Sequence, residues 1–124
     1  MNIVTSWIVS IAAAALLLQD AAAHKAWMND AADVQDELRE QLAAKSSAKA
    51  ADAATKMEAL MAQTQTYWAA KHQDDIVRIA QDARALAKQI ADLSKASRFD
   101  QANEAFNRMN ARCNACHDLH PEKR

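Results

Sequence analysis

The sequence contains no glycine in 124 residues, and this absence constrains the fold more than any other feature. Tight hairpin turns and β-bulges use backbone conformations with positive φ, which glycine adopts at little cost. A chain without glycine is therefore poorly suited to antiparallel sheets. The only proline, Pro121, lies close to the C-terminus, where it interrupts no helix. We predict an all-α protein, whose length fits a single domain.

Apolar residues recur with helical spacing in four successive segments. In the last segment the apolar positions are separated by steps of three and four residues: Phe99, Ala102, Phe106, Met109, Cys113 and Cys116. The polar breaks between segments are short, so consecutive helices must run antiparallel. We predict an up-down-up-down four-helix bundle with helices near 25–44, 48–70, 74–93 and 98–117. Ser97 and Asp100 are expected to form a capping box at the start of the last helix.

The N-terminal segment differs from the rest of the chain. Residues 7–18 are uncharged and mostly apolar, but a membrane span needs about 20 such residues. This length is typical of a signal-peptide core, and Ala21 to Ala23 offer a small-residue cleavage site. We predict a signal peptide over residues 1–23, a mature domain over residues 24–124, and a bacterial periplasmic protein without a stable membrane span. Because residues 2–7 carry no Lys or Arg, an uncleaved N-terminal anchor stays open.

The two cysteines of the chain, Cys113 and Cys116, are followed directly by His117. Cys-x-x-Cys-His is the attachment signature of c-type haem. The two thiols add across the two vinyl groups at one edge of the haem, and the adjacent imidazole binds the iron from one face. Both cysteines continue the apolar stripe of the last helix, and His117 lies on the same helical face. We predict one haem c, held by two thioethers, with His117 as a ligand of the iron.

Three other interpretations of the two cysteines stay open. A thioredoxin-like redox pair would need a strand before a helix and thiols at the helix N-terminus, where the helix dipole lowers a thiol pKa. A structural zinc site would need four ligands, which His117 and His120 would complete within eight residues. A disulfide between the two cysteines would close a very small loop.

A four-helix bundle with this motif near the end of its last helix resembles the cytochrome c-prime and cytochrome c-556 family. The residues that carry the resemblance are Arg112 to Asp118, Arg-Cys-Asn-Ala-Cys-His-Asp. In that family the two cysteines hold the haem and the histidine is its proximal ligand, which implies these roles for Cys113, Cys116 and His117. The chain departs from the family by its shorter length, its lack of glycine, and a first helix without a clear distal-ligand match.

In the predicted bundle, the end of the last helix lies beside the start of the first helix and the connection between the second and third. Trp27, Met28, Tyr67 and Trp68 are therefore expected at the haem end and as walls of the haem pocket. Met28 is the leading candidate for the sixth ligand of the iron. With a rise of about 1.5 Å per residue, Met57 and Met61 are expected too far along the second helix. An open iron face is the next alternative, followed by His24 or His72, both expected to be exposed.

The ligand of the sixth position decides the predicted function. A His/Met pair raises the reduction potential and suits electron transfer, so we predict a periplasmic cytochrome that carries single electrons between exported redox partners. An open face would instead bind nitric oxide or carbon monoxide. A haem-free helical module with a redox dithiol is a third hypothesis. The net charge of −1 gives no basic field for nucleic acid, no enzyme is predicted, and a homodimer is left open.

Overall fold

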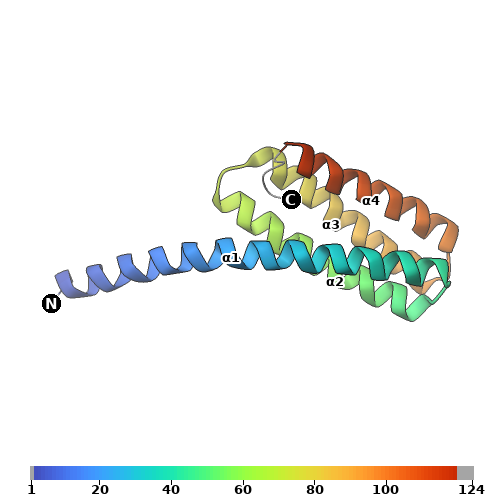
Figure 1. The fold of residues 1–124 in the computed structure, drawn as a ribbon, viewed down its shortest axis with the longest axis horizontal. Coiled ribbons are helices and arrows are strands. Elements are labelled where there is room, and N and C mark those ends of the chain that lie inside the picture. Colours follow the sequence, from blue (N-terminus) through green and yellow to red (C-terminus); the bar gives the residue numbers. More distant parts are fainter. Residues whose placement is uncertain (1, 120–124) are drawn as a thin grey trace.

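The computed structural model describes the backbone of residues 2–119 and the side chains of residues 21–119. The described chain forms four helices and no strand: α1 (Asn2–Ala43), α2 (Ser47–Ala70), α3 (Asp74–Lys95) and α4 (Phe99–Leu119) (Figure 1). The predicted all-α class is confirmed, and the helix bounds agree within two residues except at the start of α1. His120 and the side chains of residues 7–18 lie outside the described residues, and cleavage after Ala23 stays a prediction.

The three connections between helices are three-residue turns of one kind, and the middle residue of each turn has a left-handed backbone conformation. These residues are Lys45, His72 and Ser97, with φ of 54°, 57° and 56°. The residue after each donates its N–H to a carbonyl five residues earlier: Ser46 to Gln41, Gln73 to Trp68, and Arg98 to Leu93. This is the Schellman arrangement, in which the left-handed position is usually glycine. A residue with a Cβ costs about 1–2 kcal/mol there, so each turn carries strain that the helix packing must offset.

The predicted capping box at Ser97 is wrong. Ser97 has the left-handed conformation, and its hydroxyl lies 2.7 Å from that of Ser47. Helix α4 begins at Phe99, and Ala102 donates its N–H to the carbonyl of Arg98. The side-chain oxygen of Ser97 therefore joins the α3–α4 turn to the start of α2.

Alanine makes up half of the core. Of the twenty buried apolar side chains among the described residues, ten are alanine. They concentrate on the facing sides of α2 and α3, where small side chains let two helix backbones approach closely. The larger core residues fill the remaining space, and six of them are almost fully buried: Leu38, Leu42, Met57, Ile76, Ile90 and Met109.

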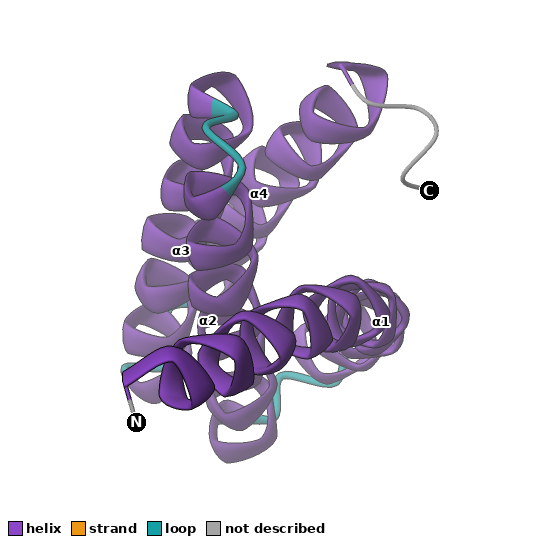
Figure 2. Ribbon diagram, turned by 90° about the vertical axis from the view of Figure 1, so that its left-hand side faces the viewer, coloured by secondary structure: helices purple, strands orange, loops and turns teal. Residues whose placement is uncertain are grey.

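The fourth side of the bundle is open. Helix α1 packs against α2, α2 against α3 and α3 against α4, whereas α1 and α4 make little contact. Figure 2 looks along α1 and shows this arrangement, with α2 beside α1 and the last turns of α4 standing apart from it. Among the described residues, no helix is long and apolar enough to cross a membrane.

Candidate functional site

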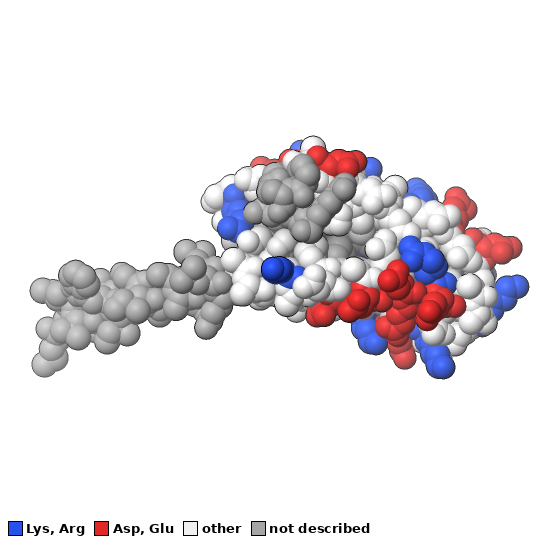
Figure 3. All heavy atoms as spheres, viewed as in Figure 1, with Lys and Arg blue, Asp and Glu red and all other residues white. Residues whose placement is uncertain are grey.

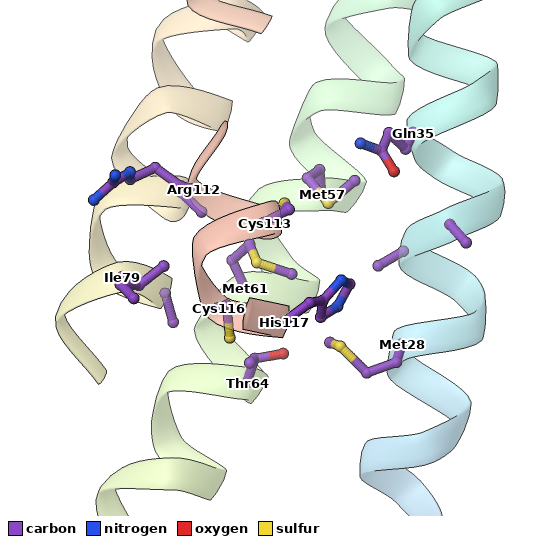
Figure 4. A pocket seen from close by; sticks show the side chains of 14 residues that line it. Met28, Gln35, Met57, Met61, Thr64, Ile79, Arg112, Cys113, Cys116 and His117 are labelled. Carbon is purple, nitrogen blue, oxygen red and sulfur yellow. The ribbon is translucent and has the colours of Figure 1, made fainter. Parts of the chain in front are cut away.

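A cavity opens between α1 and α4 and receives side chains from all four helices. It encloses about 90 Å³, and the space that includes its mouth is about 570 Å³. Figure 4 shows the side chains that surround it. The lining residues are Met28, Ala31, Ala32, Gln35, Met57, Met61, Thr64, Ile79, Ala80, Ala83, Arg112, Cys113, Cys116 and His117.

The Cys-x-x-Cys-His motif forms the α4 wall of this cavity. Cys113, Cys116 and His117 occupy positions separated by three and four residues, which share one helical face. All three side chains are half-buried and line the cavity. The motif lies within the last two turns of α4, so it is at the C-terminal end of a helix.

Both thiols are free, and their surroundings favour the protonated form. Burial raises the pKa of the Cys113 thiol from 9.0 to about 11, with a smaller contribution from the nearby Cys116. Burial also raises the pKa of Cys116, and the carboxylate of Asp75 adds to this effect. A redox pair at a helix N-terminus has a lowered thiol pKa. The position and the raised pKa values both disfavour a thioredoxin-like function.

The zinc interpretation gains no support from the described part of the chain. No group of three or more His, Cys, Asp or Glu side chains there is arranged to hold a metal ion. His120, which would supply the fourth ligand, lies outside this part.

Three methionines share the cavity with the motif. Met28 extends from α1 toward the side of the cavity where His117 projects from α4 (Figure 4). Met57 and Met61 of α2 also line the cavity, which their distance from the end of α2 does not predict. The cavity extends lengthwise into the bundle between α1 and α4, which diverge toward the C-terminal end of α4 (Figure 1). A distance counted only along α2 misses this depth.

The aromatic residues predicted as pocket walls form a separate cluster with His24. The ring of His24 stacks on Tyr67 at 4.3 Å and meets Trp68 edge to face at 5.3 Å. The Trp27 ring approaches Tyr67 edge to face at 6.4 Å. None of the four lines the cavity; they join α1 to α2 instead. His24 is buried rather than exposed, whereas His72 is exposed in its turn.

Most of the charged side chains near the cavity lie outside its lining. Acidic residues gather over the C-terminal half of α1 (Figure 3), where Asp30, Asp33, Asp36 and Glu40 are exposed. The charged side chain at the lining is Arg112, whose guanidinium lies 3.9 Å from the carboxylate of Asp82. The hydroxyl of buried Thr64 donates to the Leu60 carbonyl at 2.8 Å. Apart from Gln35 and Arg112, the lining therefore presents mainly sulfur, methyl and imidazole groups.

The donor groups of the cavity fit a haem held by sulfur. Two free thiols and one imidazole share a wall, a thioether faces them, and most of the remaining lining is apolar. Pockets for cofactors measure about 300–1,000 Å³, and the enclosed 90 Å³ is smaller than this range. A macrocycle would therefore use the open α1–α4 side. The cavity lies at the α1–α4 interface, where the described helices leave room between them.

In comparisons with known proteins, no family model, no curated protein and no solved structure matches this chain. The interpretation of the cavity therefore depends on its own geometry and chemistry.

Proposed function

We propose that the protein is a small c-type cytochrome that carries single electrons between exported redox partners, with the cytochrome c-prime and c-556 family as its relatives. The observation that carries the proposal is the meeting of Cys113, Cys116, His117 and Met28 in one cavity with a largely apolar lining. When bound, a haem would supply the one-electron couple of its iron. The protein would supply the attachment, the axial ligands and the apolar surroundings.

The two cysteines would attach the cofactor. Each thiol would add across one vinyl group, its sulfur forming a bond to one carbon and its hydrogen passing to the other, so that no oxidant is consumed. Both thiols are free and half-buried on one wall, which suits this addition. His117, one residue after Cys116, would be the proximal ligand on the same wall.

Met28 would occupy the sixth position. It comes from α1, on the opposite side of the cavity mouth from α4, and it is half-buried. A thioether opposite an imidazole gives a raised reduction potential. The apolar lining has the same effect, because it disfavours the extra charge of oxidised iron.

The test is production of the full chain with a bacterial haem-attachment system. We expect coloured protein whose haem stays bound after acid-acetone extraction and gives the pyridine haemochrome band of a c-type cytochrome. The matched control, Cys113→Ser/Cys116→Ser, should lose this covalent haem. Colourless wild-type protein with both thiols open to alkylation would refute the proposal.

The sixth ligand is tested with two volume-conserving substitutions in the same cavity. Met28→Leu should abolish the near-infrared methionine–iron band and allow ferrous protein to bind carbon monoxide. Met61→Leu, on the α2 wall, should leave both properties unchanged. Wild-type protein that lacks the band and binds carbon monoxide would instead favour the gas-binding function.

A further inference from the structure

Two side-chain contacts fasten α1 to α4 next to the cavity. The amide Nε2 of Gln35 donates to Oδ1 of Asn110 at 2.6 Å, in a partly buried position. One turn further from the cavity, the guanidinium of Arg39 lies 5.5 Å from the centre of the Phe106 ring. We call these four residues the seam latch. It spans the sparsely packed interface between α1 and α4.

The seam latch fixes how the two antiparallel helices are aligned. Passing from Arg39 to Gln35 moves four residues along α1, and passing from Phe106 to Asn110 moves four residues along α4. Seven residues, about two turns, separate Gln35 from Met28 and Asn110 from His117. Two turns return each helix to the same face, so Met28 and His117 form the next pair in this alignment. Figure 4 places Gln35 on the same helix and the same side of the cavity as Met28.

We infer that Gln35 and Asn110 are positioning residues that hold Met28 opposite His117, an inference that rests on the proposed haem function. A metal-binding group must be held to about 0.5 Å by the residues around it. Packing between α1 and α4 is too sparse to do this alone, because the cavity occupies the interface. The amide hydrogen bond between Gln35 and Asn110 therefore sets the distance between α1 and α4 next to Met28 and His117.

The test measures axial ligation in haem-loaded protein. Gln35→Leu and Asn110→Leu should weaken the near-infrared methionine–iron band. They should also raise the affinity of ferrous protein for carbon monoxide by about 10–100-fold. Losing a residue that orients a metal ligand typically weakens the binding of that ligand by this factor. Asn110→Asp, which still accepts from Gln35, should keep both properties. Asn107→Leu, an exposed asparagine of the same helix, is the matched control and should change neither.

A second measurement needs no haem. Spin labels are attached to two introduced cysteines, Ala32→Cys on α1 and Asn114→Cys on α4, both at exposed positions. The native thiols are removed with Cys113→Ser and Cys116→Ser. Asn110→Leu should broaden the distance distribution between the labels, and Asn107→Leu should not. An unchanged distribution and an unchanged band in both leucine variants would overturn the inference alone. Wild-type protein without covalent haem would overturn the proposed function, and the label distances would then decide whether the latch aligns the helices.

Discussion

The two ends of the bundle are built from the same helices but differ in how completely they close. At the closed end, where the α1–α2 and α3–α4 turns lie, Leu42, Ala50 and Ser94 are at most 1% exposed. At the cavity end, Met28, Cys113 and His117 are half-buried. The difference indicates that complete packing at the closed end supplies stability, whereas at the other end α1 and α4 lie apart around the cavity.

The largest effect should come from a cavity made at the closed end. Leu42→Ala should lower the free energy of unfolding by about 2–5 kcal/mol, because the lost side chain is fully packed. Met28→Ala in the same haem-free protein should cost less than about 1 kcal/mol, since Met28 already borders a cavity. Urea unfolding followed by circular dichroism measures both. Equal losses would show that the two ends are packed alike.

Glycine at the left-handed position should stabilise the turns at both ends of the bundle by similar amounts. Lys45→Gly at the closed end and His72→Gly at the cavity end should each stabilise the protein by about 0.5–1 kcal/mol. Glycine removes the cost of the left-handed conformation but adds some entropy to the unfolded chain. Lys45→Ala and His72→Ala keep a Cβ and serve as controls without this gain. The shift in urea midpoint is the measurement, and a gain at only one end would contradict a shared turn geometry.

The smallest effects should come from two buried hydroxyls. Ser94 is 0% exposed, and its Oγ has no hydrogen-bond partner among the described residues. Ser94→Ala should therefore change stability by between zero and a gain of about 1 kcal/mol. Thr64→Val, which removes a satisfied hydroxyl at the cavity, should cost about 0.5–1 kcal/mol. Thermal unfolding distinguishes a gain from a loss of stability. A loss of stability in Ser94→Ala would indicate that the Ser94 hydroxyl has a hydrogen-bond partner.

Helical periodicity was enough to predict the four helices and their order. Steps of three and four residues locate an amphipathic face wherever it occurs, because that face depends only on local geometry. The placement of Cys113, Cys116 and His117 on one face followed from the same rule. The left-handed conformation of the turn residues could not be predicted in this way. Lys45, His72 and Ser97 are ordinary polar residues whose conformation is imposed by the helices they join.

Contacts between helices were predicted less well. The depth of the cavity, which brings Met57 and Met61 to its lining, depends on how α4 diverges from α1. The clustering of Trp27, Tyr67 and Trp68 around a buried His24 depends on how α1 rotates against α2. Neither tilt nor rotation is encoded in spacing along a single helix.

The sequence by itself determined a helical chain with one sulfur-and-imidazole face near its end, because the absence of glycine and a period of 3.6 residues act within each helix. Only the tertiary structure decided that this face borders an open seam, which methionines share that space, and that Gln35 meets Asn110 across it. These features depend on the relative positions of helices, which side-chain volumes set jointly through packing.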